Sequence, residues 1–377
     1  MKNVKLYHAI ILSIVLSSVS FSFAQEDKEK TFNVSRGDKL KVSSSFGNIS
    51  YDLTSGNEVK VIAKNVLSSE LRQLRMEKKG STIDIEFRGE DSRNFSFEIS
   101  GPATLDLDFS TGGGNVAVNG NVEGFVDIST AGGNISTGDI NGKADISTAG
   151  GNIKINDVNG DADVSTAGGD MKFGNINGTA DISTGGGNIK IGSINKSADV
   201  STGGGNISID DIGGNADVST GGGNIKIERV SGSADISTGG GNIKLASATG
   251  KVDVSTGGGN IRLNNIKGTV DASTGAGNIS ADILPEGQGK SDMSTGMGNI
   301  TLTIPESAQV TIIATTHVMM WDEDQDKLEN IKSDFEPTSV KRHREEKYIE
   351  AKFELNGGGS LIEVSTGMGD IELRKKN

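Results

Sequence analysis

Cysteine is absent from this chain of 377 residues, so disulfides and lipid attachment at a cysteine are excluded. Aromatic residues make up only 4% of the sequence, too few for an ordinary globular core of this length. The apolar run Ala9–Leu16 is too short to span a membrane, which takes about 20 residues. A formal charge of −13 argues against nucleic acid or an anionic membrane as a partner. We therefore expect no nucleic-acid partner and no transmembrane segment in the mature chain.

Glycine, by contrast, is abundant, and many of the 54 glycines lie in one repeated phrase. Eleven copies, typified by STGGGNI, begin between Ser110 and Ser294. From Ser129 to Ser273 successive copies begin every 18 residues, and a twelfth copy, STGMGDI, begins at Ser365. A fixed period in this range indicates a repeat architecture.

Each repeat unit predicts β structure. In the unit at residues 216–233, polar and inward-facing residues alternate over Ala216–Thr220 and again over Ile225–Ile227, which is the two-residue period of a strand with one buried face. The glycines between these segments, Gly221–Gly223, allow a sharp corner, and Val230 supplies one more buried side chain. Nothing in the unit has helical spacing.

Two architectures could use such a unit. Gly-rich turns between short strands also suit an antiparallel meander, because pairs such as Asn141-Gly142 favour hairpins. A long meander would leave one apolar face uncovered, whereas a coil that closes on itself buries its strands against one another. We therefore predict an all-β parallel solenoid of 18-residue coils with β-rich caps at both ends. At about 4.8 Å per coil, eleven coils form a rod on the order of 50 Å long.

The chain divides into four predicted regions. Residues 1–24 have the features of a secretory signal peptide, because two lysines precede a short apolar run and a small-x-small cleavage pattern. A β cap is predicted over 25–109, the solenoid over 110–300, and a second cap over 301–377. The second cap contains an irregular polar insertion, 322–347, which we expect to be helical or mobile. We expect the exported protein to occupy the periplasm or the cell surface, without disulfides and as a monomer.

The first cap is predicted to contain a disordered leader at residues 25–30 and one short helix over Ser69–Lys79, among several strands. The phrase SSFGNI within it looks like a divergent copy of the repeat. In the second cap we expect strands over Gln309–Thr315 and Tyr348–Leu355 and a last coil containing Ser365. Caps are needed because exposed coil ends would pair with other rods.

Stacking in register turns every repeat position into a column, and one column is acidic. Two residues before each repeat serine stands an acidic residue, and neighbouring charges about 4.8 Å apart repel by roughly 1 kcal/mol even in water. This row is either a site for divalent cations such as calcium or for a cationic partner, or a solvated face; no other cofactor is expected. The candidate residues of the regular part are Asp127, Asp145, Asp163, Asp181, Asp199, Asp217, Asp235, Asp253 and Asp271. A partial basic column lies across the glycine corner: Lys154, Lys172, Lys190, Lys226, Lys244 and Arg262.

Other candidate sites have weaker patterns. The asparagine that follows most of the glycine runs predicts an amide ladder that satisfies the turn backbone, rather than a ligand contact. Asp322, Asp324 and Asp326 are spaced like the start of an EF-hand loop, but the required Gly and Glu are missing downstream. The two histidines of the mature chain lie near Trp321 in the second cap, and no catalytic residues are assigned.

The arrangement resembles the bacterial putative-adhesin family, also called the Toastrack domain. The resemblance rests on SSFGNISYDL near the start and on the STGGGNI series, and it covers Thr31 to Leu373. It implies exported β-repeat proteins with a surface or periplasmic role, and it supplies no catalytic residues. The function we predict is a non-enzymatic envelope or cell-surface solenoid that binds a surface protein or glycan. The alternative is a glycan-active enzyme or a periplasmic sensor that uses the insertion in the second cap.

Overall fold

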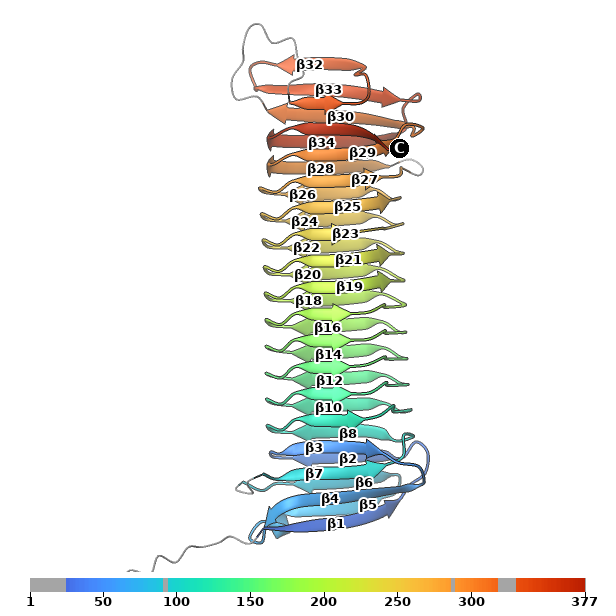
Figure 1. Ribbon diagram of the computed structural model, residues 1–377, viewed down its shortest axis with the longest axis vertical. Helices are drawn as coiled ribbons and strands as arrows, with labels where there is room; N and C mark the ends of the chain where they lie inside the picture. Colours follow the sequence, from blue (N-terminus) through green and yellow to red (C-terminus); the bar gives the residue numbers. More distant parts are fainter. Residues whose placement is uncertain (1–24, 91–93, 286–288, 318–329, 377) are drawn as a thin grey trace, which may run out of the picture.

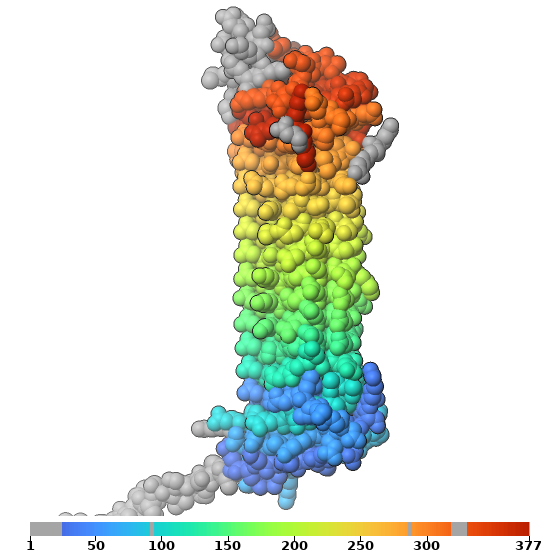
Figure 2. All heavy atoms as spheres, turned by 45° about the vertical axis from the view of Figure 1, so that its right-hand side comes forward, coloured from blue at the N-terminus to red at the C-terminus, as the bar shows by residue number. Residues whose placement is uncertain are grey.

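The computed structural model describes residues 25–90, 94–285, 289–317 and 330–376. It is a single long rod of stacked rungs, in which a rung is one strand, a glycine corner and the next strand (Figure 1). In the space-filling view, side chains of successive rungs form ridges along the rod (Figure 2). The predicted signal peptide, 1–24, lies outside the described residues.

Each regular rung contributes one strand to each of two sheets, which we call A and B. Within each sheet, the strand of one rung pairs in parallel with the equivalent strand of the next; Asp217, for example, lies beside Asp199 and Asp235. The regular strands of sheet B are β10 (Val126–Thr130), β12 (Ala144–Thr148), β14 (Ala162–Thr166), β16 (Ala180–Thr184), β18 (Ala198–Thr202), β20 (Ala216–Thr220), β22 (Ala234–Thr238), β24 (Val252–Thr256) and β26 (Val270–Thr274). Those of sheet A are β9 (Val116–Asn119), β11 (Ile135–Thr137), β13 (Ile153–Ile155), β15 (Met171–Phe173), β17 (Ile189–Ile191), β19 (Ile207–Ile212), β21 (Ile225–Val230), β23 (Ile243–Leu245), β25 (Ile261–Ile266) and β27 (Ile279–Ile283). The predicted parallel solenoid is confirmed, and the antiparallel meander is excluded.

The core is a narrow column of small apolar side chains between the two sheets. In β20 and β21 the inward residues Val218, Ile225 and Ile227 are at most 1% exposed. The third inward residue of each unit, such as Val158, pairs with its equivalents in neighbouring rungs through single bridges and lengthens the wall of sheet A. Because each rung needs only a few branched aliphatic residues, the chain folds with very little aromatic content.

A buried threonine joins each rung to the one before it. Thr220 Oγ1 donates a hydrogen bond to the carbonyl of Gly205 in the preceding rung (2.8 Å) and accepts one from the amide of Gly223 (3.3 Å). The same pair of bonds recurs at Thr130, Thr148 and further along the column. The threonine thus satisfies corner backbone groups that the stacked strands leave unpaired.

The three glycines of a corner face different surroundings. A Cβ at Gly223, the third of its corner, would lie 1.9 Å from the carbonyl oxygen of Gly205, whereas a Cβ at the middle glycine, Gly222, would meet nothing within 4 Å. The sequence follows this geometry. The third position is glycine in every copy, but Phe46 and Met297 occupy the middle one.

The amino-terminal end has a rung order that differs from the chain order. Its elements are β1 (Gln25–Asn33), β2 (Lys39–Ser44), β3 (Asn48–Leu53), β4 (Glu58–Leu67), the 3-10 turn η1 (Leu71–Gln73), β5 (Leu74–Lys79), β6 (Thr82–Phe87), β7 (Ser96–Gly101) and β8 (Asp106–Thr111). Strand β2 lies between β6 and β8, and β3 lies between β7 and β9, so the chain passes outward and then returns. Ser43 is in register with Ser110, which confirms that SSFGNI is a copy of the repeat.

Two predictions for this end are wrong. Residues 25–30 are the start of β1, which pairs antiparallel with β4, and Lys64 binds Asp27 across this pair at 2.9 Å. The segment Ser69–Lys79 forms one 3-10 turn followed by β5, antiparallel to β6, because an unpaired sheet edge was available to it.

The carboxyl-terminal end repeats this interleaving. Its strands are β28 (Lys290–Met297), β29 (Ile300–Pro305), β30 (Val310–His317), β31 (Ile331–Ser333), β32 (Ser339–His343), β33 (Tyr348–Leu355), β34 (Ser360–Met368) and β35 (Ile371–Lys376). Strand β34 lies between β28 and β30, and β35 lies between β29 and β31. Beyond β30, β33 runs antiparallel, and β32 pairs antiparallel with β33 at the end of the rod (Figure 1). The predicted strands at 309–315 and 348–355 and the last coil are confirmed. Within the insertion, the described part contains the strands β31 and β32 rather than a helix.

Candidate binding faces

The acidic row runs along the outer face of sheet B. Pairing in register places the nine predicted aspartates, Asp127 to Asp271, one above another. Asp108 precedes them, and Asp292 and Glu363 follow in the same column. These side chains are exposed or half-buried, so the structure brings together the whole predicted set.

Counter-charges lie mainly at the two ends of this row. Lys39 binds Asp108 at 2.6 Å, and Lys290 binds Glu363 at 2.9 Å. Between Asp163 and Asp235, the described residues include no ion pair to the row. The middle of the row, where Asp181, Asp199 and Asp217 line a shallow depression of about 420 Å3, therefore carries uncompensated negative charge.

The electrostatics of the row agree with this crowding. Partial burial, and then the charges of the aspartates above and below, raise the pKa values of Asp199 and Asp235 above the ordinary aspartate value of 3.8. The pKa of Asp127 is raised for the same reasons. Each of these groups is therefore easier to protonate in the folded rod than in the unfolded chain.

The row is a line of carboxylates rather than a cage. Rungs are about 4.8 Å apart, and each contributes one carboxylate to the line. Among the described residues, no three acidic or histidine side chains form a group that could hold a metal ion. Calcium bound to this row would contact neighbouring carboxylates only in pairs, without the six to eight oxygen ligands that calcium prefers.

The basic column runs along the outer face of sheet A, so the acidic row and the basic column lie on different sheets. Lys154, Lys172 and Lys190 are adjacent and exposed, Ser208 interrupts the column, and a second block of three continues to Arg262. Within the second block, Lys226 is paired with Glu228 at 2.6 Å. For the other basic residues of the column, the described part of the chain contains no ion pair.

The asparagines beside the basic column form the predicted ladder. The backbone N–H of Asn224 donates a hydrogen bond to Oδ1 of Asn206 (2.8 Å), and the side-chain Nδ2 of Asn224 donates to the same oxygen (3.1 Å). The pattern continues at Asn242 and Asn260. The structural role predicted for this column is confirmed.

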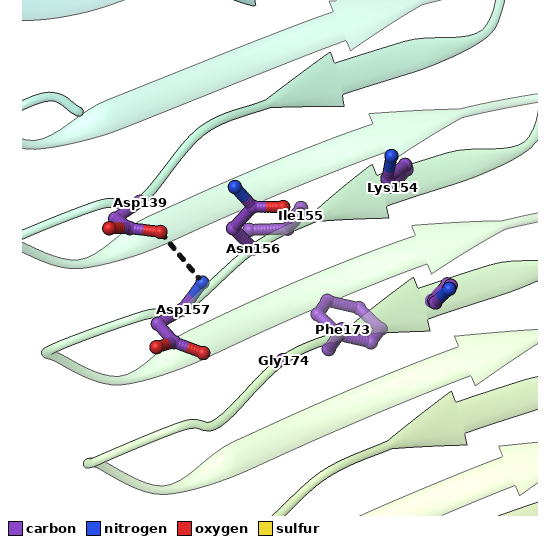
Figure 3. Close-up of a pocket in the computed structure, with 8 residues that line it drawn as sticks. Asp139, Lys154, Ile155, Asn156, Asp157, Phe173 and Gly174 are labelled. Atoms are coloured by element: carbon purple, nitrogen blue, oxygen red, sulfur yellow. Dashed lines mark hydrogen bonds between the residues drawn. The ribbon is translucent and has the colours of Figure 1, made fainter. Parts of the chain in front are cut away.

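Two depressions open along the basic column. One, of about 450 Å3, lies where Gly174 lacks a side chain, and its rim contains both signs of charge: Lys154 and Lys172, but also Asp139 and Asp157 (Figure 3). The second, of about 440 Å3, lies farther along the rod, and its lining among the described residues consists of two cations, three asparagines, a serine and two isoleucines. Sequence reasoning identified the basic column but not this depression, because the relation of the column to the asparagine ladder depends on the corner geometry.

The second cap provides less evidence for a site. The ring of His343 stacks on the ring of Tyr348, with centroids 4.1 Å apart. His317, on the strand on the opposite side of β33, has its ring centroid 6.1 Å from that of Tyr348. Within the described residues, Nε2 of His343 is buried without a hydrogen-bond partner. Trp321 and the candidate calcium ligands Asp322, Asp324 and Asp326 lie outside the described residues. No helix in the described ranges is long and apolar enough to cross a membrane.

Several solved structures align with most of the chain, among them proteins named as putative adhesins and one named as a putative lipid binding protein. A putative adhesin from Parabacteroides merdae is 16% identical, with a TM-score of 0.27, over 74% of this chain and 96% of its own. A putative adhesin from Bacteroides fragilis is 12% identical over 94% and 99%, with a TM-score of 0.23. A putative lipid binding protein from Parabacteroides distasonis is 14% identical over 92% and 96%, with a TM-score of 0.24. No family model and no curated protein sequence matches the chain.

Proposed function

We propose that this chain is an exported, non-enzymatic binding scaffold of the adhesin type, placed in the cell envelope or at the cell surface. Its acidic row on sheet B is the binding face, and its partner is a protein or glycan surface that presents positive charges. One copy carries the entire row, so the working unit is a monomer. The single observation that supports this proposal is the run of aspartates from Asp163 to Asp235 that form no ion pair with any described residue.

Physical chemistry favours a partner with many charges over a single small ligand. Each carboxylate of the row is partly exposed, so a single ion pair contributes only about 0.2–1 kcal/mol. A rigid line of such groups, held at fixed spacing by backbone pairing, can engage a multivalent partner without ordering its own side chains first. The rod supplies length and rigidity, and the row supplies the charge.

The proposal is tested by binding to immobilised poly-L-lysine at low and high ionic strength. The variant D181S/D199S/D217S should bind about tenfold more weakly than the unmodified protein, since three ion pairs are lost. The matched control D210N/D211N/E228Q removes the same charge from sheet A and should bind within about threefold of the unmodified protein. Equal losses in both variants, or no binding by the unmodified protein, would show that the row is not the binding face.

Calcium provides a second measurement on the same row. Because adjacent carboxylates coordinate the ion only in pairs, we propose weak binding that raises the melting temperature by less than about 2 °C. The rise should disappear in D181S/D199S/D217S. A much larger rise would instead indicate a closed calcium site.

A further inference from the structure

The polar side chains that line the second depression on sheet A are three asparagines, two cations and one serine, and all six can donate hydrogen bonds. We call its polar residues the donor strip. They come from three successive rungs and are Asn242, Lys244, Asn260, Arg262, Asn278 and Ser280. Among the described residues no carboxylate lines this depression, which distinguishes it from the depression around Gly174.

The amides of the donor strip are oriented by the ladder. Oδ1 of Asn242 accepts the backbone amide of Asn260 (2.9 Å) and also its Nδ2 (3.0 Å), and Oδ1 of Asn260 accepts the backbone amide of Asn278 (2.9 Å). A backbone N–H can only donate, so these bonds fix which amide atom is oxygen. An amide nitrogen carries two hydrogens, and the ladder bond of Asn260 uses one. The second is left for a ligand.

The two cations of the strip are free to bind. Lys244 and Arg262 are exposed neighbours in the column, and neither has an ion pair within the described ranges. In the preceding rung, Glu228 forms its ion pair with Lys226 at 2.6 Å and attracts Lys244 only through a weaker, longer-range interaction. Two like charges about 4.8 Å apart repel each other, so an anion that binds both relieves that repulsion.

From these observations we propose that the donor strip binds a linear anionic polysaccharide, one whose sugar units carry carboxylates. The carboxylates would lie against Lys244 and Arg262, the latter in the two-point geometry that guanidinium groups favour, while hydroxyls accept from the asparagine amides. The depression is large enough for a small ligand group, and the strip spans three successive rungs along the rod. The ligand is therefore elongated, rich in acceptors and negative.

A second copy of this chain is the competing occupant, since its acidic row has the same rung spacing. The strip, however, is concave and spans the angle between the corner amides and the sheet face. Aspartate side chains on a flat sheet are short, and those reaching Lys244 and Arg262 would leave the amides of the corner without acceptors. A flexible sugar chain can contact both sets of donors, so the geometry favours the polysaccharide.

The test measures binding of full-length protein to polygalacturonate, with dextran as the neutral polymer and dextran sulfate as a different anion. Serine occurs naturally in this column at Ser208 and Ser280, so K244S/R262S should fold normally, which its melting temperature would verify. We expect polygalacturonate to bind, dextran not to bind, and K244S/R262S to weaken binding at least tenfold. The matched control K154S/K172S removes the same charge where carboxylates line the depression, and it should weaken binding less than about threefold.

Several outcomes would overturn the proposal. Equal losses in the two double variants would show a general charge effect, and equal or tighter binding of dextran sulfate would reject a carboxylated ligand. Absence of polygalacturonate binding, together with self-association at low ionic strength that K244S/R262S abolishes, would identify a second copy as the partner. The acidic-row variant D181S/D199S/D217S should retain polygalacturonate binding, so this proposal and the proposed function can fail independently.

Discussion

The regular rungs and the two ends of the rod are stabilised by different means. In the regular rungs, each strand pairs with the strand of the next unit in the chain, and the side chains are small. At the ends, β2 and β34 are inserted between strands that are not their neighbours in the repeat order, and antiparallel strands lie outside them. Aromatic rings gather at the amino-terminal end, where Phe87 and Phe95 stack with centroids 4.0 Å apart. A repeated sequence can thus specify a body of any length, but closing it takes residues that occur once.

Removing an end should have the largest effect. Deletion of residues 357–377 takes away β34 and β35 and leaves β28 and β30 without their shared partner. We expect the melting temperature to fall by more than about 10 °C and aggregates to appear in sedimentation, because open strand edges pair with other chains. Deleting one regular unit, residues 216–233, should leave a folded, shorter monomer. Equal behaviour of the two deletions would contradict the distinction between body and ends.

A corner glycine gives a smaller effect within the body. Gly223→Ala would place a methyl 1.9 Å from a backbone oxygen of the preceding rung, so we expect destabilisation of about 3 kcal/mol in chemical unfolding. Gly222→Ala, one residue away, meets open space and does not require a left-handed backbone, so stability should change by less than about 0.5 kcal/mol or rise slightly. Similar losses for both substitutions would mean that the rungs are not stacked as closely as described.

The smallest effect concerns pH. The raised pKa values of Asp199 and Asp235 mean that the folded state binds these protons more tightly, so the two aspartates destabilise the rod at neutral pH. D199N/D235N should therefore melt slightly higher than the unmodified protein at pH 7. This difference should vanish as the pH falls through the raised values toward 3.8, because the unmodified carboxyls then become neutral.

Asp161 provides a control of opposite sign. Its carboxylate accepts the backbone amide of Thr179 at 2.8 Å, and this bond lowers its pKa. The stabilisation from this bond is fully present at pH values above the ordinary aspartate pKa, and it is lost as the pH falls through the lowered pKa of Asp161. Asp161→Asn should therefore not stabilise the rod at pH 7. If D199N/D235N and Asp161→Asn showed the same dependence of melting temperature on pH, the stacking of the acidic row would not be the cause of the pH effect.

The structure of the regular rungs could be predicted closely from the sequence, because the 18-residue period fixes the register of every column. The division into caps and solenoid at 110 and 300 stays a prediction. Local pattern failed where tertiary contacts decided the outcome. Residues 25–30 are almost all charged, yet β4 offered them a sheet edge, with Lys60 holding Glu29 at 3.0 Å.

The candidate faces were predicted only in part for a related reason. The acidic row follows directly from the period, since every unit places its aspartate at the same position. The donor strip depends on how close the glycine corner brings Asn260 to Arg262, and the spacing of residues in the sequence does not reveal this distance. The buried threonines were also missed as rung connectors, although their presence in every regular unit was a usable signal.

The interleaved ends also set an order of events for a chain that is synthesised from its amino terminus. Strand β2 cannot complete its pairing until β8 has emerged, so the first turn of the rod waits for more than sixty residues to follow it. Each later turn can then settle on a finished template. At the far end, the edge of β28 that faces β30 stays unpaired until the last part of the chain follows. Strand β34 then inserts between β28 and β30 and pairs with both. The last segment to be synthesised is the one that completes the structure.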